Sequence, residues 1–310
     1  MRQEMEYIYA VYHNGSLSKA AEKLYVTQPA LSMAIKKIES AIGMALFDRS
    51  KRPLALTEAG RLYIDSIARI QQIEEELQQQ ISDISELKAG RLRIGGSHYI
   101  NAYILPSVLT RFSRLYPGVT LELVEHSSAV LSQMLEERRV DLTFSCNEQF
   151  MKDFERYPVF YDHILLALHE AHPFNQEHKK YALTPRAVLN GRHLAPRCPV
   201  VPVETFKDLE FITLSSGNNL HDRVAEIFAQ AGAKIQTKLE LAQLATAYHL
   251  AENSFAATFV SDRMVNAASP LRFYKIQSSL TDRLFYILLP HREYTSRAVQ
   301  SFIAHFRENM

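Results

Sequence analysis

Polar and basic side chains gather in one short stretch near the start of the chain. Between residues 27 and 37 they recur at helical spacing, as expected for one exposed helix face. Glutamine can form paired hydrogen bonds to adenine, serine can bond several bases, and lysine can contact phosphate. The pattern therefore predicts a helix that reads DNA from the major groove. Its candidate contact residues are Thr27, Gln28, Pro29, Ser32, Met33, Lys36 and Lys37.

Two short helices separated by a tight turn would position these side chains. The first begins after Gly15 and Ser16, where the serine can cap free backbone amides. The second has Thr27 as its cap, carries Pro29 in its first turn and ends at Gly43. Its buried stripe is predicted to contain Ala30, Leu31, Ala34, Ile35 and Ile38. This order of elements is typical of a helix-turn-helix module.

A basic turn follows the second helix. Arg49, Lys51 and Arg52 lie between two short apolar segments, and we interpret them as a wing whose cations face the sugar-phosphate backbone. Residues 16–53 contain seven Lys or Arg and three acidic residues, a balance of +4 in a chain whose formal net charge is +1. The basic character is therefore local, which indicates one surface for nucleic acid.

Six short motifs between residues 20 and 60 resemble, in order and spacing, those of LysR-type transcriptional regulators. They are AAEKL, TQPALS, IKKIE, IG, LFDRS and LTEAG. The resemblance implies a winged helix-turn-helix that reads the major groove of double-stranded DNA, with Arg49 supporting the wing. Met33 and Ala34 depart from the polar or basic residues that family members often carry there. The positions that the resemblance places at the DNA are Thr27, Gln28, Pro29, Ser32 and Lys36.

A long amphipathic helix is predicted from Thr57 to Lys88, because apolar residues recur three or four positions apart from Ile64 to Leu87. An exposed apolar seam of this length is a liability for a monomer. We therefore predict that two such helices pair in a homodimer, or in a dimer of dimers. The alternative is that the stripe packs on its own chain. Paired reading heads would match inverted half-sites in DNA.

Beyond Gly90 strands alternate with helices, which predicts two α/β lobes. At 310 residues and 47% hydrophobic content, the chain can fill two or three cores. The predicted fold class is α/β multidomain, with an effector-binding domain whose two lobes resemble, by family, periplasmic binding proteins. The predicted divisions are a winged helix-turn-helix at 1–60, a linker and dimerisation helix at 61–90, and the effector-binding domain at 91–310. By resemblance, lobe I covers about 91–162 and 269–310, lobe II covers about 163–268, and the chain crosses near 161–164 and 268–271.

Hydroxyl side chains follow several predicted strands, next to the helix starts. Ligands of open α/β sheets bind at the carboxyl ends of the strands, and free amides at helix starts favour negative charge. The sequence therefore predicts a small anion or organic acid as effector, bound in a cleft between the lobes. The alternative for each serine is a plain helix cap. The candidate effector-binding residues are Ser97, His98, Tyr99, Asn101, Ser127, Ser128, Asn147, Ser215, Ser216 and Asn218.

Cysteine and histidine show no grouping that predicts chemistry. Cys146 and Cys198 lie outside any CxxC pair, which argues against a disulfide framework and a redox switch. The twelve histidines are scattered along the chain. His169 and His172 have helix-like spacing, but the nearby Pro173 predicts a loop there and not a metal site. We therefore expect no metal ion and no other cofactor.

Two stretches depart from the family pattern. Residues 172–209 contain five prolines and are longer than their family counterpart, so we expect them to reshape the rim of the cleft. In residues 251–261, Asn253 stands near the position of a family glycine. Asparagine tolerates the left-handed backbone conformation that glycine supplies, so we expect the turn to be kept at Asn253.

Other classes of protein explain less of the chain. We find no Ser/His/acid motif, phosphate-binding glycine loop or close carboxylate pair, so an enzyme is not expected. A solute-binding protein would account for 91–310 but not for 1–90, and Glu4 and Glu6 interrupt any signal peptide. A DNA-bending protein would need no ligand cleft. With apolar runs too short for a membrane span, we predict a cytoplasmic regulator that binds DNA and a small effector, with RNA polymerase as a further partner.

Overall fold

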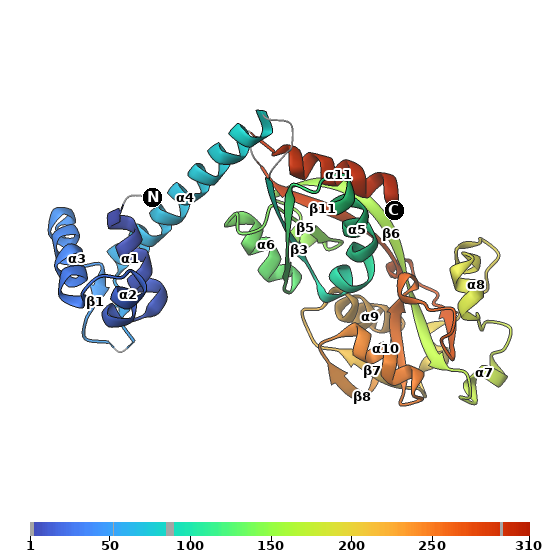
Figure 1. Ribbon diagram of the computed structural model, residues 1–310. Helices are drawn as coiled ribbons and strands as arrows, with labels where there is room; N and C mark the ends of the chain where they lie inside the picture. The colour runs from blue at the N-terminus through green and yellow to red at the C-terminus, as the bar shows by residue number, and fades with distance from the viewer. Residues whose placement is uncertain (1–2, 52, 85–89, 292–293) are drawn as a thin grey trace. The chain divides into compact units, whose positions relative to one another are not determined.

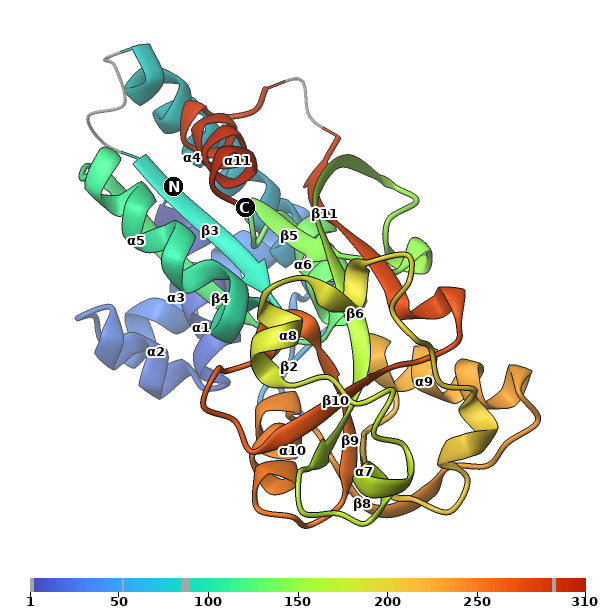
Figure 2. The same ribbon diagram turned by 90° about the vertical axis from the view of Figure 1, so that its right-hand side faces the viewer.

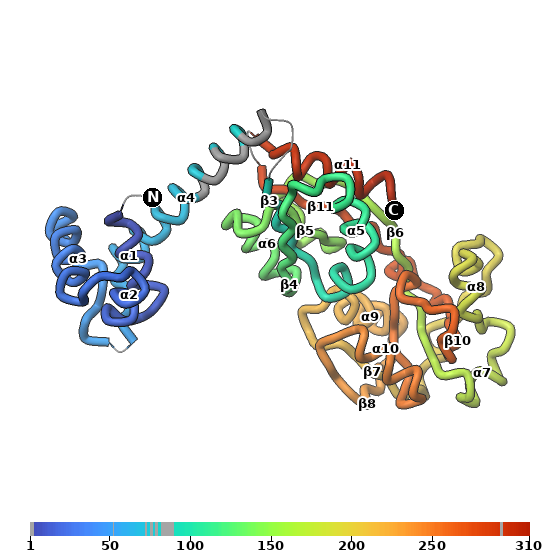
Figure 3. Tube along the Cα trace, in the orientation of Figure 1, coloured from blue at the N-terminus to red at the C-terminus, as the bar shows by residue number. Residues whose placement is uncertain are grey.

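The computed structural model divides into two compact units, residues 1–84 and 85–310, and each is described by itself. It describes residues 3–51, 53–84, 90–291 and 294–310, whose path is drawn in Figure 3. Arg52 and residues 85–89, which include the predicted end of the long helix at Lys88, lie outside the described residues. Among the helices of the described residues, none is long and apolar enough to cross a membrane.

The first unit is a small helical domain with a two-stranded hairpin (Figure 1). Its core is formed by apolar side chains from every helix and from the hairpin, among them Ile8, Ala20, Leu31, Phe47 and Ile67. Helix α1, which was not predicted, contacts α2, α3 and α4. The elements are α1 (Gln3–Asn14), α2 (Leu17–Lys23), α3 (Gln28–Ile42), β1 (Phe47–Asp48), β2 (Ala55–Leu56) and α4 (Glu58–Ile84).

The start and end of α3 follow from local chemistry. The Thr27 hydroxyl accepts a hydrogen bond from the Ala30 amide at 3.4 Å, and Gly43 ends the helix at φ 78°, a conformation that favours glycine. Ser16 differs from the prediction, because its backbone is extended before α2 but its hydroxyl caps no amide. The prediction for Ala30 is also wrong. The buried stripe consists of Leu31, Ile35 and Ile38. Ala30, which directly precedes Leu31, is exposed.

The start of α4 is fixed to the segment that follows α3. The Thr57 hydroxyl donates to the Ala45 carbonyl at 2.6 Å and accepts from the Gly60 amide at 3.0 Å. A Cβ atom on Gly60 would lie 2.0 Å from the Leu46 carbonyl oxygen, so only glycine fits there. The LTEAG motif therefore carries a packing requirement. Because its glycine has no side chain, the first turn of α4 can lie close to Leu46, and Ile64 and Ile67 of α4 pack into the core.

The second unit contains two β-sheets that share one strand. The strand order is β4-β3-β5-β11-β6-β9-β7-β8, and β10 pairs with β6. Its elements begin with β3 (Gly90–Gly96), η1 (Ile100–Ile104), α5 (Leu105–Leu115), β4 (Val119–Glu125), α6 (Ser128–Glu136), β5 (Leu142–Ser145), η2 (Glu148–Phe150) and β6 (Phe154–His169). They continue with α7 (Phe174–Glu177), α8 (Pro185–Leu189), η3 (Arg192–Leu194), η4 (Val203–Phe206), β7 (Glu210–Leu214), α9 (Asn219–Gln230), β8 (Gln236–Leu241), α10 (Leu244–Glu252), β9 (Ala257–Ser261) and η5 (Asp262–Met264). They end with β10 (Leu271–Lys275), η6 (Ser279–Thr281), β11 (Asp282–Pro290) and α11 (Arg297–Asn309).

Strand β6 belongs to both sheets. Its residues 154–163 pair with β11, and its residues 164–169 pair with β9 and β10. The first sheet combines the parallel strands β3, β4 and β5 with antiparallel β11 and β6. The change of sheet falls between His163 and Ile164. We call this point the β6 crossing, and Figure 2 shows β6 running from the first sheet toward β9 and β10.

Helices cover the first sheet on both faces. On one face α5 and α11 pack together through Phe112 and Phe302, whose ring centroids lie 5.3 Å apart (Figures 1 and 2). Helix α6 contributes to a separate core on the other face, where its Leu131 and Leu135 join Leu288 of β11. Neighbouring residues of β11 therefore enter different cores, as the alternation of side chains along a strand requires.

The predicted second crossing at residues 268–271 is wrong. Strand β10 (271–275) pairs with residues 165–169 of β6 and therefore belongs to the second sheet. Bridges from Leu183 to Phe273 and from Val201 to Ile276 tie the 172–209 stretch to this segment. That packing keeps β10 with the second sheet, and the chain rejoins the first sheet at Asp282.

The turn after α10 uses a different residue from the one predicted. Ser254 has the left-handed backbone at φ 60°, whereas Asn253 is at φ −90°. The Asn253 side chain instead donates a hydrogen bond to the His249 carbonyl at 2.8 Å and so closes the end of α10. The turn is kept, but one residue later than expected.

Candidate functional site

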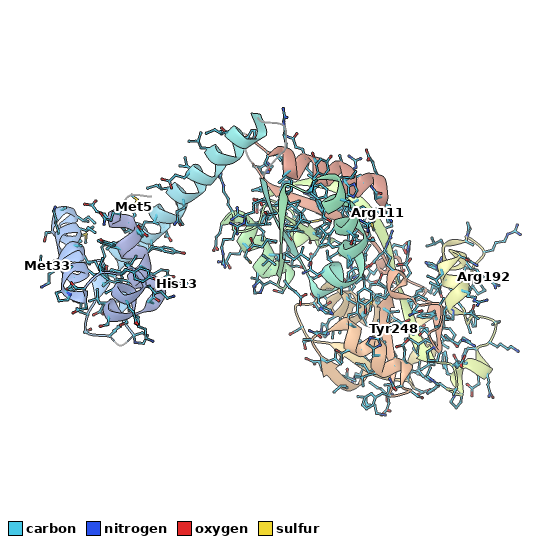
Figure 4. All side chains as sticks on the ribbon, in the orientation of Figure 1. Met5, His13, Met33, Arg111, Arg192 and Tyr248 are labelled. Atoms are coloured by element: carbon cyan, nitrogen blue, oxygen red, sulfur yellow. The ribbon has the colours of Figure 1, made fainter. Side chains whose placement is uncertain are left out.

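The outer face of α3 carries the residues predicted to contact DNA. Thr27, Gln28, Pro29, Lys36 and Lys37 are exposed and Ser32 is half-buried. Met33 is 70% exposed on the same helix and is labelled in Figure 4. An apolar side chain this exposed on a helix of a folded domain adds nothing to the core. It is therefore available to a partner that covers the helix.

The wing is fastened to the end of α3. Both oxygens of the Glu39 carboxylate are used: Oε1 accepts from the amides of Leu46 and Phe47 at 2.9 and 3.3 Å, and Oε2 pairs with Arg49 at 3.2 Å. At the other end of the hairpin the Leu54 amide donates to the Gly15 carbonyl at 3.1 Å. Arg49 therefore holds the wing in place, which leaves Lys51 as an exposed cation at its tip.

A cavity of about 390 Å³ lies at the carboxyl ends of five strands in the second unit. The segments after β3, β4 and β5 form one side, and those after β7 and β8 form the other. Eight of the predicted effector residues line it: Ser97, His98, Tyr99, Ser127, Ser128, Ser215, Ser216 and Asn218. Lining residues that the sequence did not single out include Glu125, Cys146, Asn219, Gln243 and Arg283.

Asn101 and Asn147 are not among the described residues that line this cavity. The Asn101 side-chain amide donates to the Gly96 carbonyl at 3.3 Å, so it serves the turn after β3. Asn147 caps η2 by accepting a hydrogen bond from the Gln149 amide at 3.0 Å. The 172–209 stretch, expected at the rim, contributes no lining residue either, because it packs on β10.

Three α-helices begin at the cavity, and they differ in how their first amides are used. Asn218 precedes α9 and accepts a hydrogen bond from the Leu220 amide at 3.0 Å, so the side chain of this residue acts as a plain helix cap. Ser127 precedes α6 and Gln243 precedes α10, and neither side chain caps its helix. The first amides of α6 and α10 are therefore without a capping side chain at the cavity wall.

A buried ion pair forms the floor between the lobes. Arg283 of β11 and Asp162 of β6 stand opposite each other in the strand register, with nitrogen to oxygen distances of 2.5 and 2.6 Å. Their side chains are 3% and 0% exposed. Burial alone would lower the pKa of Arg283, but the Asp162 carboxylate raises it far above the usual value, so the guanidinium stays charged. The two residues are 121 positions apart, and no local pattern joins them.

Cys146 is a buried thiol at the cavity wall. It lies 3.0 Å from the Asn219 side-chain oxygen. Burial raises its pKa to about 11, the opposite of the shift that makes a cysteine reactive. Neither it nor Cys198 forms a disulfide.

A winged helix-turn-helix joined to a two-lobed α/β domain with a polar cavity defines a ligand-responsive DNA-binding protein. Comparison with protein-family models agrees. The model for the LysR substrate binding domain matches residues 85–310, and the model for the bacterial regulatory helix-turn-helix protein of the lysR family matches residues 2–61. The chain belongs to the LysR family, and it is a LysR-type DNA-binding transcriptional regulator with an effector-binding domain. The predicted fold class is thereby confirmed.

Known relatives cover the whole chain. The uncharacterized HTH-type transcriptional regulator YcgK of Bacillus subtilis is 28% identical over 99% of this chain and 94% of its own length. Full-length CbnR, solved with its target DNA, has a TM-score of 0.68 at 17% identity and covers 99% of both chains. The effector-binding domain of QuiR in complex with shikimate has a TM-score of 0.57 at 14% identity, covering 71% of this chain and 96% of that one.

The buried ion pair generates a stability prediction. Asp162→Asn should destabilise the protein by about 3–5 kcal/mol, because it leaves the Arg283 guanidinium buried without a counter-charge. Glu122→Gln, which breaks the exposed pair with Arg91, should cost no more than about 1 kcal/mol. Denaturant unfolding followed by circular dichroism checks both. Equal losses for the two variants would contradict the role of the buried pair.

Proposed function

We propose that the chain reads DNA sequence through α3 and contacts the phosphate backbone through the wing. The observation that carries this is the exposed face of α3, where Gln28 suits adenine, Lys36 suits phosphate and the Met33 thioether suits a thymine methyl group. CbnR, whose fold the chain shares, was solved on its target DNA. We also propose that the chain has no enzymatic role.

Two substitutions separate sequence reading from phosphate contact. Gln28→Ala should lower discrimination between the specific site and random DNA by about tenfold or more, because a paired hydrogen bond to a base is lost. Lys51→Ala should weaken binding to both DNAs alike and reduce the salt dependence by about one phosphate contact. Fluorescence anisotropy at several salt concentrations measures both effects.

Lys234→Ala is the matched control for charge, since it removes an exposed lysine of the second unit. It should leave both affinities and the salt slope unchanged. Unaltered discrimination in the Gln28 variant would overturn the placement of α3 at the bases. An unaltered salt slope in the Lys51 variant would remove the wing from the interface.

We propose that α4 pairs with α4 of a second copy, which makes the chain a homodimer or a dimer of dimers. Ile73, Leu77 and Ile81 follow one another at four-residue spacing, and each is more than half exposed within its unit. Three large aliphatic side chains on one helix face form a typical helix-pairing seam. Dimerisation would bring two α3 helices to inverted half-sites.

A charge in the seam tests the pairing. Leu77→Asp should shift the chain to a monomer at micromolar concentration, because pairing would bury an unpaired carboxylate. Ala68→Asp adds the same charge at an exposed position on another side of α4 and should leave the assembly intact. Light scattering coupled to size-exclusion chromatography measures the mass. A wild-type chain that stays monomeric across micromolar concentrations would rule the seam out.

The cavity best fits a small organic anion. The uncapped starts of α6 and α10 direct partial positive charge at it, and hydroxyls of Ser97, Ser128 and Ser215 add hydrogen-bond donors. Among the described residues of the wall Glu125 is the one that carries a carboxylate, and it lies 3.4 Å from His98. A volume of about 390 Å³ suits a compact molecule. QuiR, a structural neighbour, binds shikimate, which supports an organic acid as ligand.

A matched pair of substitutions at the first residue of α6 tests the charge of the ligand. A panel of small carboxylates should contain at least one that raises the melting temperature of the wild-type chain. Ser128→Asp should abolish that rise through charge repulsion, although an acid at this position suits the helix itself. Ser128→Ala should lower the affinity only by a few fold, as one hydrogen bond is lost.

Binding to the target DNA without ligand should be unchanged in both variants, which serves as the control for folding. Equal melting shifts in the wild type and in the aspartate variant would show that the ligand is not an anion bound at α6. A panel that produces no shift would count against a carboxylate ligand altogether.

The alternative, a solute-binding protein without a regulatory role, accounts only for the second unit. The lysR-family match over residues 2–61 favours the regulator. Because the chain regulates transcription, we propose RNA polymerase as a further partner. We also propose that the protein is located in the cytoplasm, where the DNA is. The DNA-binding experiments above discriminate the two alternatives, because a solute carrier would show no sequence preference.

A further inference from the structure

Two histidines and an aspartate that are far apart in the sequence meet at the β6 crossing. His163 is the last residue of β6 in the first sheet, His193 lies in η3, and Asp262 begins η5. The histidines are 99 and 69 positions from the aspartate. The histidines are scattered along the sequence, but the expectation that they form no group is wrong for the folded chain, where two of them meet.

Both imidazoles hold the same oxygen atom. His163 Nδ1 lies 3.0 Å and His193 Nε2 lies 2.9 Å from Asp262 Oδ2. The three atoms lie within 4.8 Å of one another. A metal ion with ligands at about 2.0–2.2 Å separates neighbouring ligand atoms by roughly 2.9–3.5 Å, depending on the coordination angle. The two nitrogen to oxygen distances meet this requirement as they stand, and the two nitrogens meet it once the rings turn toward each other.

Neighbouring groups orient the Asp262 carboxylate, and the partial exposure of His163 leaves access for an ion. The His163 amide donates to the other Asp262 oxygen, Oδ1, at 3.0 Å, which keeps Oδ2 turned toward the histidines. The His193 side chain is 4% exposed, Asp262 is 12% and His163 is 22%, so an ion would enter past His163. His163 Nε2 lies 3.9 Å from the Asp282 carboxylate. Ligand histidines of metal sites commonly have such a carboxylate behind them.

The charge of the cluster also suits a cation. The Asp262 carboxylate is the acidic member of the cluster, and both of its oxygens accept hydrogen bonds, Oδ1 from the His163 amide and Oδ2 from the two rings. His193 Nδ1 is buried and has no hydrogen-bond partner among the described residues. The ring is therefore hydrogen-bonded through Nε2, to Asp262, and not through Nδ1.

We propose that His163, His193 and Asp262 form a binding site for a divalent transition-metal ion. Two imidazole nitrogens with one carboxylate oxygen are a ligand set of zinc and non-haem iron sites, whereas Mg²⁺ and Ca²⁺ prefer oxygen ligands alone. On binding, the nitrogen of each ring that faces Asp262 must be free of its proton: a doubly protonated ring releases that proton to solvent, and a neutral ring carries its single proton on the other nitrogen. The ion would join the 172–209 stretch to the β6 crossing.

Zinc binding to the full chain tests the site. After treatment with a chelator, isothermal calorimetry should show one Zn²⁺ per chain, and Zn²⁺ but not Mg²⁺ should raise the melting temperature. His163→Asn and His193→Gln place an amide nitrogen close to the lost ring nitrogen, so the hydrogen bond to Asp262 is kept while the metal ligand is removed. Each should lower the Zn²⁺ affinity at least tenfold. The control His249→Gln removes an exposed imidazole that bonds only Glu252, at 2.8 Å, and should change nothing.

A wild-type chain that binds no Zn²⁺, or variants that bind it as the wild type does, would overturn the proposal. A second readout needs no variant and therefore no assumption about folding. Zn²⁺ should protect His163 from carbethoxylation in the wild-type chain while His249 stays reactive, as measured by mass spectrometry. Equal modification of His163 with and without Zn²⁺ would also contradict the site.

Discussion

The buried pair of Asp162 and Arg283 is the constraint on which the arrangement of the second unit depends. It joins β6 to β11 one residue before the β6 crossing, where the chain leaves one sheet for the other. A slip of one residue would separate the two charges inside the protein, so the pair fixes the register of both strands. Arg283 also lines the cavity. The ion pair therefore fixes two strands of the first sheet next to the β6 crossing, and it holds Arg283 at the wall of the cavity.

Local chemistry made the first unit predictable. Thr27, Pro29 and Gly43 define α3 through a cap, a fixed φ angle and a left-handed turn, all of which act within a few residues. The same kind of reasoning failed at Ser16, whose hydroxyl caps no amide, and at Ala30, which is exposed beside the buried stripe. In the second unit the strands and helix starts were readable, and so were eight residues of the cavity wall. Arg283, the sheet to which β10 belongs and the histidine cluster were not, because each depends on contacts between segments many tens of residues apart.

The functions that we propose concentrate at two kinds of place in this chain. One is the start of a helix, where short polar side chains would serve DNA recognition at α3 and free amides would bind an anion at α6 and α10. The other is the β6 crossing, where the buried ion pair and the histidine cluster lie on neighbouring residues, Asp162 and His163. A ligand in the cavity and an ion at the cluster would thus act on the same strand, at the point where the two lobes meet.

We propose that an anion in the cavity changes DNA binding by α3. The most direct test is the affinity of the full-length chain for its target DNA, measured across a titration with the carboxylate that best stabilises the protein. The DNA affinity should change by about 5–150-fold at saturation, and the carboxylate affinity should change by the same factor when DNA is bound. DNA affinity that stays constant while the cavity fills would contradict it.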